Sequence, residues 1–198
     1  MEMNLIGRIF VNSFIWNYLN KKFLMPLIFD NLLREDYARV LDLGCGIGYT
    51  SREVANRLRN AEVFGVDYDR RQIRKANRRN KSRRIRFLVG DGKNLGFSNG
   101  YFDAVFAFDT MHHIEDYEEA IEEMSRVLRK NGDLYVLDVD KKFFNPVIKW
   151  IDNTQSLFSR EEFIDRLKEH GFRVYKEGKR LSLFYAVARK FDFLPPRS

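Results

Sequence analysis

The sequence predicts an α/β fold in which a mostly parallel sheet is covered by helices on both faces. Three observations support this prediction. Short apolar segments typical of buried strands alternate with helical segments from residue 38 onward. The first strand runs directly into a glycine-rich turn, the place where such sheets meet their ligands. The last two strand-like segments form a hairpin-like pair, which adds an antiparallel strand at one edge.

The composition is that of one globular domain. The chain has 198 residues, of which 44% are hydrophobic and 32% are charged, so it can bury a sizeable core. A single cysteine excludes a disulfide framework and a cysteine-based zinc site, and with three histidines no metal enzyme is expected. We expect one domain over residues 1–198, with a helical cap at 1–36, a core at 37–190 and a tail at 191–198.

The first 36 residues are predicted to be helical and rich in aromatic side chains. Pro26 is expected to begin a second helix, where its missing N–H group costs little. The helix before it is apolar on nearly all sides, so it forms a lid over a ligand, a membrane-surface element or a core helix. Polar residues interrupt the stretch 5–16, which matches neither a signal peptide nor a membrane span. We therefore expect a cytoplasmic protein.

Five short apolar segments are predicted to form the parallel part of the sheet. They occupy residues 40–43, 63–67, 85–89, 102–108 and 134–139. The hairpin-like pair that follows occupies residues 172–175 and 181–188.

Helices are predicted between these strands, at 50–58, from Asp69 onward, at 116–129 and at 159–171. Their boundaries carry recognisable signals. Asp69 with Gln72, and Ser159 with Glu162, have the spacing of capping boxes. Asn131-Gly132 is expected to end the third helix and Gly171 the fourth.

The net charge of +7 is concentrated in one segment. Ten Lys and Arg residues and no acid lie between Arg70 and Arg86, so the rest of the chain is mildly acidic. Such a run attracts nucleic acid or an anionic membrane surface. It is equally typical of a solvated helix whose cations complement the negative end of the helix dipole. No aromatic residue lies within the run to stack on bases, which favours the solvated helix.

The turn after the first strand carries glycine at Gly44, Gly46 and Gly48. Glycine permits positive φ angles and lets a ligand approach the backbone. A dinucleotide-binding turn would need its third glycine one residue later, where Tyr49 stands, and no Gly-Lys-Ser/Thr follows to make a phosphate-binding loop.

Two carboxylates accompany this turn. Asp67 ends the second strand, where a carboxylate can accept hydrogen bonds from both hydroxyls of a ribose. Asp42 lies within the first strand, and its charge would repel a pyrophosphate but suits an ammonium or sulfonium group. The residues therefore favour an amino-acid nucleoside over NAD as the ligand.

The segment Val40 to Thr50, V-L-D-L-G-C-G-I-G-Y-T, resembles motif I of the class I S-adenosylmethionine-dependent methyltransferases. Further segments continue the resemblance in order: Gly65-Val66-Asp67, Gly90-Asp91-Gly92, Phe102-Asp103-Ala104-Val105, Met111-His112-His113-Ile114 and Arg126-Val127-Leu128-Arg129-Lys130-Asn131-Gly132. The histidine segment, with Asp116, resembles the type 11 small-molecule group, relatives of the quinone-biosynthesis methyltransferases. Asn131 stands where that group usually has proline.

The resemblance covers roughly residues 38–190. It implies a Rossmann-like doubly wound sheet of seven strands in the order 3-2-1-4-5-7-6, with strand 7 antiparallel and helices at the N-terminus. It also implies S-adenosyl-L-methionine as the cofactor and no metal.

The resemblance further implies a cofactor-binding set: Asp42, Gly44, Cys45, Gly46, Gly48, Asp67, Tyr68, Asp91, Gly92, Phe108 and Asp109. In that set the glycine turn passes the methionyl part of the cofactor, and Asp42 faces its ammonium group. Asp67 holds the ribose and Tyr68 lies against the adenine, whose amine and ring are met by Asp91 and Gly92. Phe108 and Asp109 line the methionyl end. For Asp91 a plain turn-forming role stays open, and Asp69 is expected to cap a helix only.

His112 and His113 are the candidate catalytic residues. Both follow the fourth strand, where the resemblance places the methyl group, and either could act as a base near neutral pH. The alternative is that one histidine caps the next helix and the other packs in the core.

The acceptor is expected to lie between the N-terminal helices and the segment 141–150, with Phe158 nearby. That segment is aromatic with a few cations, which suits a small apolar or aromatic acceptor, although simple core packing explains it too. Two other functions stay open: an RNA-modifying methyltransferase that uses the basic segment 70–86, and a cofactor-binding scaffold without catalysis. A peripheral membrane contact also stays open, and the sequence does not give the oligomeric state.

Overall fold

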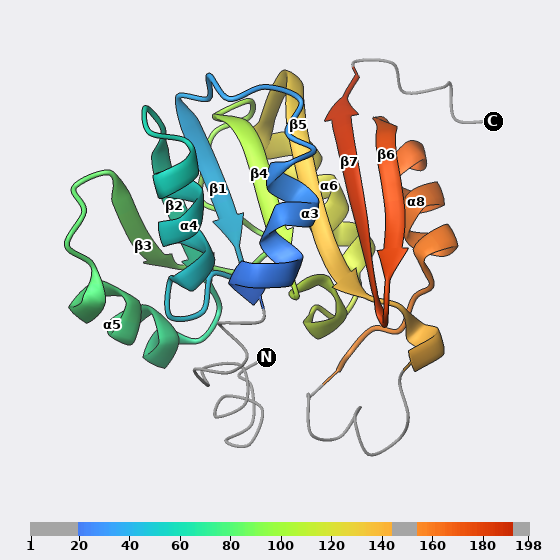
Figure 1. Ribbon diagram of the computed structural model, residues 1–198, viewed down its shortest axis with the longest axis horizontal. Helices are drawn as coiled ribbons and strands as arrows, with labels where there is room; N and C mark the ends of the chain where they lie inside the picture. Colours follow the sequence, from blue (N-terminus) through green and yellow to red (C-terminus); the bar gives the residue numbers. More distant parts are fainter. Residues whose placement is uncertain (1–19, 144–153, 192–198) are drawn as a thin grey trace.

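One sheet of seven strands, in the order β3-β2-β1-β4-β5-β7-β6, forms the centre of the protein (Figure 1). The structure is a computed structural model that describes residues 20–143 and 154–191, so the predicted first helix and most of the aromatic segment 141–150 lie outside the described residues. The sheet contains β1 (Arg39–Leu43), β2 (Glu62–Asp67), β3 (Ile85–Val89), β4 (Phe102–Phe108), β5 (Leu128–Val139), β6 (Phe172–Arg180) and β7 (Leu183–Lys190).

The pairing of the strands matches the predicted doubly wound arrangement. β1 pairs in parallel with β2 and β4, β2 with β3, and β4 with β5. β7 is antiparallel to both β5 and β6. The predicted strand order and the antiparallel seventh strand are therefore confirmed.

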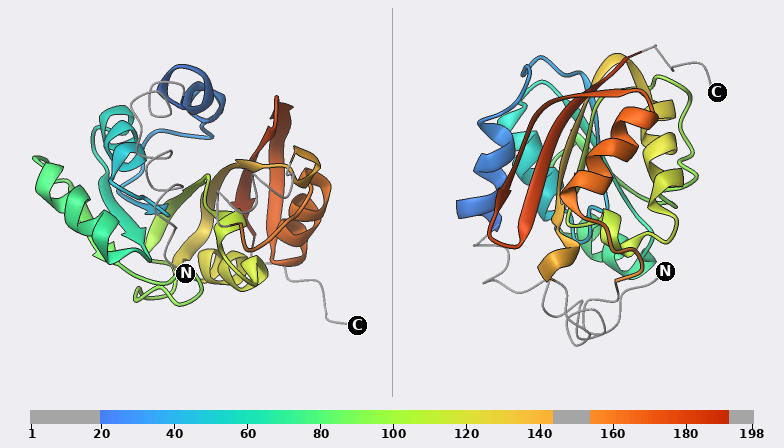
Figure 2. Two further views of the ribbon diagram at one scale, coloured as in Figure 1. Left: turned by 90° about the horizontal axis from the view of Figure 1, so that it is seen from below. Right: turned by 90° about the vertical axis from the view of Figure 1, so that its right-hand side faces the viewer.

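Helices cover both faces of the sheet (Figure 2). The described helical elements are η1 (Asn20–Leu24), α3 (Met25–Phe29), α4 (Tyr49–Arg57), α5 (Arg70–Arg79), η2 (Met111–His113), α6 (Tyr117–Val127), η3 (Lys141–Phe143) and α8 (Arg160–Glu169). α3, α4 and α5 lie on one face, where their apolar residues pack with Val40, Val63 and Phe106. α6 and α8 lie on the other face and pack with Leu41, Phe64 and Val105. Successive residues of one strand therefore contribute to two separate hydrophobic cores, because their side chains point alternately to opposite faces of the sheet.

Helix caps follow the predicted residues with one difference. Ser159 and Glu162 form a complete capping box at the start of α8. Asp69 caps α5 by accepting from the N–H of Arg71, and its predicted capping-box partner Gln72 does not complete a box. Pro26 stands in the first turn of α3, as expected.

The predicted end of the third helix is wrong. α6 ends at Val127 and β5 begins at the next residue, so Asn131-Gly132 lies inside a strand that starts six residues earlier than predicted. Leu128 is fully buried and pairs with Phe102, and the register between β4 and β5 then shifts before Asp133 meets Ala104. The irregularity places Asn131 at a φ of 56°, so the two residues make a bulge in the strand.

Residues 34–37 are fixed to the amino-terminal end of β5 by a buried carboxylate. Asp133 accepts from Tyr37 Oη at 2.8 Å, from Arg34 Nε at 3.2 Å and from Arg189 Nε at 2.6 Å. Burial, followed by the neighbouring Tyr135 hydroxyl, raises the pKa of Tyr37 far above its usual value, so this residue stays a neutral donor. This network lies at the opposite end of the strands from the cavity described below. Within the described residues, no helix has the length and apolar character needed to cross a membrane.

Candidate active site

A cavity of about 480 Å³ opens at the carboxyl ends of the parallel strands. This volume lies within the range of roughly 300–1,000 Å³ that is usual for small-molecule sites. Its walls come from the turns that follow β1, β2, β3 and β4, with Leu137 of β5 and Met25 of α3 closing two sides. The site therefore lies where open α/β sheets bind their ligands.

The structure brings ten of the predicted site residues to this cavity: Gly44, Cys45, Gly46, Asp67, Tyr68, Asp91, Gly92, Phe108, Asp109 and His113. Three predicted residues are not among those that line it: Asp42, Gly48 and His112. These three residues lie behind the residues that line the cavity. Each of them supports a lining residue or the glycine turn.

The glycine turn needs glycine for a different reason at each position. Gly44, Gly46 and Gly48 have φ angles of 73°, 52° and 78°, a region that other residues adopt at a cost. A Cβ atom on Gly44 would lie 1.9 Å from Thr110 Oγ1, and one on Gly48 would lie 2.3 Å from the Phe87 ring. A Cβ on Gly46 would meet nothing within 4 Å. Gly44 and Gly48 therefore permit packing, whereas Gly46 leaves space where a ligand can approach the backbone.

Asp67 joins this turn to the second strand. Its Oδ2 accepts from the N–H of Gly46 and its Oδ1 from the N–H of Asp69, each at 2.8 Å. Burial raises the pKa of this carboxyl, while the two backbone donors act in the opposite direction. A carboxylate has about four acceptor sites, so each oxygen of Asp67 can still accept a ligand hydroxyl.

Asp42 is the expected ammonium partner, and the structure places it behind the glycine turn. Its Oδ2 accepts a hydrogen bond of 2.5 Å from Ser51 Oγ of α4, and the residue is only 1% exposed. Burial raises its pKa to about 7, against the opposing effect of the Ser51 bond. Any interaction with a cation in the cavity therefore acts across the turn rather than through direct contact.

Asp91 has the turn-forming role that the sequence left open, and it also lies in the cavity wall. In this turn its Oδ1 accepts from the N–H of Lys93 at 2.9 Å. Beyond this turn, Lys93 Nζ lies 3.6 Å from Asp116 Oδ2 and 3.3 Å from Glu119 Oε2, both at the start of α6. The loop after β3 is thus tied to the loop after β4, and the two form one continuous wall.

The segment after β4 is organised by a carboxylate that the sequence analysis missed. Asp138 of β5 is fully buried, and its Oδ2 accepts from the N–H groups of Thr110 and Met111 at 3.2 and 2.8 Å. Its Oδ1 lies 2.6 Å from His112 Nδ1. Burial alone would raise the pKa of Asp138, but His112 and the backbone donors lower it below its usual value.

The two histidines have separate positions. His112 is 1% exposed and is held by Asp138, whereas His113 lines the cavity. Their ring centroids are 4.0 Å apart, so the fixed ring of His112 forms a support for the ring of His113. The carbonyl of His112 also accepts from the N–H groups of Gln155 and Ser156, which attaches the far wall of the cavity to the same turn.

Several lining residues had no signal that the sequence analysis used, among them Met25, Thr110, Lys93, Gln155 and Gln72. The one hint for Asp138 in the sequence is that this residue is charged and stands within an otherwise apolar strand. Asp109, which was predicted on resemblance, has a φ of 54°, a left-handed backbone conformation that often marks functional sites. Among the described residues, no group of His, Cys, Asp and Glu side chains could hold a metal ion.

Comparison with known proteins assigns this architecture to a family. A family model described as "methyltransferase domain" matches residues 41–136, which span the sheet from β1 into β5 and contain the whole glycine turn. The chain belongs to the class I S-adenosylmethionine-dependent methyltransferases. Within this family it falls in the type 11 group, as the histidine segment indicated.

Two curated methyltransferases and one solved structure illustrate the similarity. Methyltransferase GfsG of Streptomyces halstedii is 34% identical over 105 residues, 51% of this chain and 37% of that protein. A demethylmenaquinone methyltransferase of Thermotoga maritima is 26% identical over 187 residues, 81% of this chain and 79% of that protein. The crystal structure of the PH0226 protein of Pyrococcus horikoshii OT3 has a TM-score of 0.76 at 24% identity and covers 91% of this chain and 93% of that one. The chain spans little more than a third of the first relative, and the structural likeness concerns the fold alone.

The cofactor of this methyltransferase domain is S-adenosylmethionine, and the residues present fit it. Asp67 retains acceptor capacity for the two ribose hydroxyls, and Tyr68 offers an aromatic face at the rim. The space over Gly46 admits the methionyl part close to the backbone, and Asp42 provides negative charge behind it. The donor and acceptor set matches an amino-acid nucleoside, as the sequence predicted.

Proposed function

We propose that this methyltransferase transfers a methyl group by in-line displacement to a small apolar or aromatic acceptor. The observation that carries the proposal is the part of the cavity wall formed at the ends of β4 and β5. Phe108, Ile114 and Leu137 contribute apolar surface there, and His113 lines the same cavity. Such a wall suits an acceptor that is largely apolar and carries one ionisable nucleophilic group.

When bound, S-adenosylmethionine supplies an activated methyl group, so the protein's task is orientation and electrostatics. Asp67, Asp91 and the glycine turn would fix the cofactor at one side of the cavity. His113 and the apolar wall would hold the acceptor at the other side, in line with the methyl group. Holding two reactants in this way contributes up to roughly 7–11 kcal/mol in model systems.

His113 is the candidate for removing the acceptor's proton. It lines the cavity, and His112 with Asp138 holds its ring from behind. His112 itself is better suited to positioning, because Asp138 occupies its Nδ1 and the ring is buried. The base role of His113 is needed only for an acceptor that must lose a proton.

The names of relatives support a small acceptor. The Thermotoga maritima relative covers most of both chains and is named for demethylmenaquinone, an aromatic quinone. RNA as the acceptor is less compatible with the cavity, because its lining includes the acidic residues Asp69, Asp91, Asp109 and Glu115. These carboxylates would repel the phosphates that flank a nucleotide. The sequence Asp109-Thr110-Met111-His112 also replaces the Asn-Pro-Pro-aromatic motif of many amide and nucleobase N-methyltransferases.

The test is transfer of labelled methyl groups from S-adenosylmethionine to demethylmenaquinone and to fractionated cell extracts, with cell RNA as a separate fraction. We expect label in an organic-soluble small-molecule fraction. Label in the RNA fraction alone would overturn the proposal. A thermal-shift measurement is the companion experiment, because a ligand bound only by the folded state raises the melting temperature. If S-adenosylmethionine stabilises the protein but no fraction is labelled, the chain is a binding scaffold rather than an enzyme.

A further inference from the structure

The basic segment noted in the sequence forms one exposed face of α5 and the loop after it. In α5 the side chains of Gln72, Ile73 and Ala76 are buried against the sheet, while every Lys and Arg of the helix is exposed. No Asp or Glu occurs between residues 70 and 90 to neutralise them. We call this surface the cationic face; it consists of Arg70, Arg71, Arg74, Lys75, Arg78, Arg79, Lys81 and Arg83.

Two other cations of the segment have structural roles and are not part of this face. Arg84 donates to the carbonyl groups of Ala55, Leu58 and Ala61, and so caps the carboxyl end of α4. Arg86 lies 3.7 Å from Glu62 on the neighbouring strand. The sequence alone could not separate these two from the eight that remain, because the separation depends on contacts with α4 and β2.

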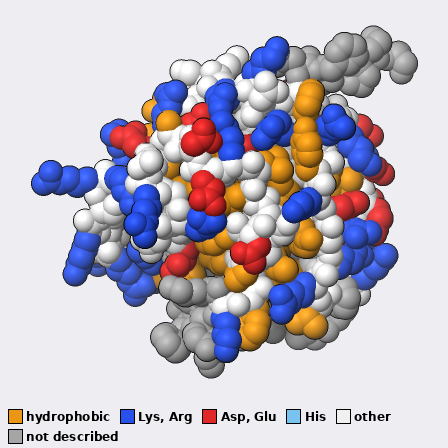
Figure 3. All heavy atoms as spheres, turned by 45° about the horizontal axis from the view of Figure 1, so that its top comes forward, with side chains coloured by type: hydrophobic (Ala, Val, Ile, Leu, Met, Phe, Trp, Pro, Cys, Tyr) orange, Lys and Arg blue, Asp and Glu red, His pale blue; other side chains and the backbone are white. Residues whose placement is uncertain are grey.

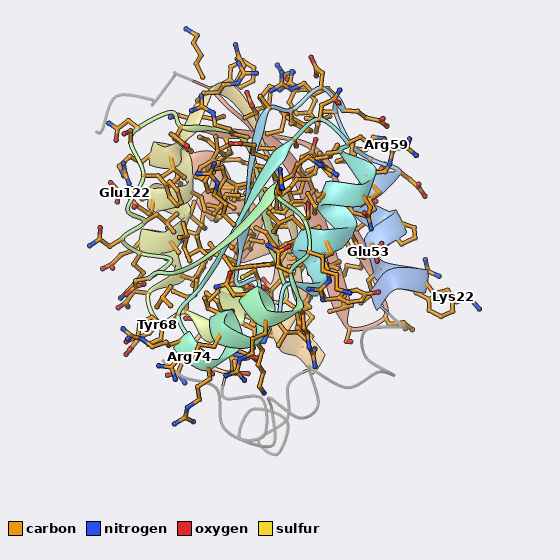
Figure 4. All side chains as sticks on the ribbon, turned by 90° about the vertical axis from the view of Figure 1, so that its left-hand side faces the viewer. Lys22, Glu53, Arg59, Tyr68, Arg74 and Glu122 are labelled. Atoms are coloured by element: carbon orange, nitrogen blue, oxygen red, sulfur yellow. The ribbon has the colours of Figure 1, made fainter. Side chains whose placement is uncertain are left out.

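The cationic face begins at the mouth of the cavity. α5 starts directly after Tyr68 and Asp69, which line the cavity, and Gln72 in its first turn lines it too. Figure 4 labels Tyr68 and Arg74 in the same region of the view, at the lower end of the sheet. In the view from below, α5 lies at the left edge of the protein (Figure 2, left). On the face shown in Figure 3, Lys and Arg side chains gather at the left edge, toward β3 and α5, whereas the middle carries both signs of charge.

We propose that the cationic face of α5 docks this protein onto an anionic lipid bilayer, with the mouth of the cavity beside the lipid surface. The charge of the face complements a planar array of lipid phosphates, and clustered Lys and Arg residues are attracted to such a surface. Tyr68, which is 52% exposed at the rim, is a residue type that suits the interface between water and lipid. The contact is electrostatic and peripheral, because the apolar side of α5 is used for packing in the core. The benefit of this arrangement, direct access to a lipid-soluble acceptor, rests on the proposed function.

Two other occupants of this face fit less well. A second copy of the chain, paired symmetrically through this surface, would oppose one cationic face to another, and the like charges would repel. An RNA bound along α5 would bring its phosphates toward the acidic residues that line the cavity, among them Asp69, Asp91 and Glu115. A bilayer would contact α5 from outside, so its phosphates would stay away from those carboxylates and only a neutral acceptor would pass them.

The test is co-sedimentation of the full chain with vesicles, without cofactor or acceptor. Vesicles of phosphatidylglycerol and phosphatidylcholine in equal parts are compared with vesicles of phosphatidylcholine alone. We expect binding only to the anionic vesicles, and release by salt, because a surface potential acts within about one Debye length.

The decisive comparison uses two variants with the same change in net charge. In the first, Arg74, Lys75, Arg78 and Arg79 are replaced by Gln; in the second, the exposed residues Lys130, Lys168, Arg173 and Lys176 are replaced by Gln. The second set lies on α8, β6 and the start of β5, away from α5. At roughly fivefold per cation near an anionic surface, the first variant should lose at least about a hundredfold in vesicle partitioning, and the second should change little.

Three results would overturn the proposal: equal losses in both variants, unchanged binding in the first variant, or tighter binding of the wild type to single-stranded RNA than to anionic vesicles at physiological ionic strength. Circular dichroism of both variants checks that α5 still folds. Because these measurements involve neither turnover nor cofactor, their failure is distinct from failure of the proposed function, which titration calorimetry with S-adenosylmethionine and the labelled-methyl assay address separately.

Discussion

The cavity has two halves that are built in different ways, one at the ends of β1 and β2 and one at the ends of β4 and β5. In the first half the backbone forms the site: Gly44 N and Cys45 N both donate to the carbonyl of Val66, and Gly46 N donates to Asp67, so internal hydrogen bonds fix the glycine turn. In the second half side chains form the site: Asp138 holds the N–H groups of Thr110 and Met111 and the ring of His112.

This difference predicts how each half responds to substitution. A backbone site depends on φ angles and on the absence of Cβ atoms, so its specificity is fixed by a short stretch of sequence. A side-chain site depends on partners that are 26 to 28 residues apart in sequence and can be altered one residue at a time. We therefore expect substitutions in the first half to change cofactor affinity, and substitutions in the second half to change turnover or stability.

The largest effect is expected at His113. If it removes the acceptor's proton, His113→Ala should lower turnover by about 10²–10⁴-fold. The affinity for S-adenosylmethionine, measured by calorimetry, should stay within about twofold of the wild type, because the residue lies on the acceptor side. His170→Ala is the matched control, since His170 stands at the end of α8 and does not line the cavity. Full turnover in His113→Ala would leave orientation as the protein's contribution to the reaction.

The next effect is expected at Asp138, in the free energy of unfolding. Asp138→Ala removes the partner of a buried histidine and the acceptor of three backbone N–H groups, which should cost about 3–5 kcal/mol. Because the pKa of Asp138 is lowered in the folded state, this stabilisation is present at neutral pH and is lost as the pH falls through that pKa. Urea unfolding at neutral and acidic pH measures both effects. Asp165→Ala, at an exposed ion pair of α8, should change stability by less than about 0.5 kcal/mol, and an equally small change for Asp138→Ala would contradict the role given to it.

A smaller effect is expected in the first half, at Asp67. Asp67→Ala should weaken the affinity for S-adenosylmethionine by about 1.5–3 kcal/mol, the usual range for losing hydrogen bonds to a charged group. Asp69→Asn is the matched control: Asp69 also lines the cavity, but its carboxylate caps α5, and an Asn cap preserves that bond. Calorimetry should therefore find nearly unchanged affinity in Asp69→Asn. If the two variants lose equal affinity, Asp67 has no special role in holding the ribose.

The same division explains what could be predicted from the sequence. The alternation of strands and helices, the glycine turn and Asp67 follow from short local patterns whose meaning does not depend on distant residues. The strand order and Asp91 were predicted from the family resemblance that such patterns carry. Asp138 could not be assigned, because its partners come from another strand end and become neighbours only when β4 and β5 pair. The extent of β6 was missed for a related reason: this edge strand continues to Arg180 through exposed polar residues, which show no apolar alternation.

Strand β3 shows a further feature that sequence patterns did not reveal. It is an edge strand, and its outward carbonyl groups accept from two asparagine side chains. Asn80, the residue that follows α5, donates to Ile85 at 2.8 Å, and Asn77 of α5 donates to Phe87 at 3.4 Å. An edge strand with free carbonyl groups invites pairing with another chain. Here the helix that carries the cationic face also covers the edge of the sheet.

The smallest effect on cofactor affinity is expected at Asp42. This residue tests the comparison between the two halves of the cavity, because it belongs to the first half but acts through its charge from behind the glycine turn. Its pKa in the folded protein is about 7, above the usual value for Asp, so near neutral pH a fraction of the molecules carries a protonated Asp42. A cationic ligand in the cavity favours the carboxylate and lowers that pKa, so binding should release a fraction of a proton. The affinity for S-adenosylmethionine should then rise by less than about tenfold between about pH 6 and pH 8.

Calorimetry in two buffers with different ionisation enthalpies measures the released proton, and Asp42→Asn, which keeps a partner for Ser51, should abolish this proton release. Identical binding heats in both buffers for the wild type would show that Asp42 does not sense the ligand's charge, and the first half of the cavity would then act through its backbone and Asp67 alone.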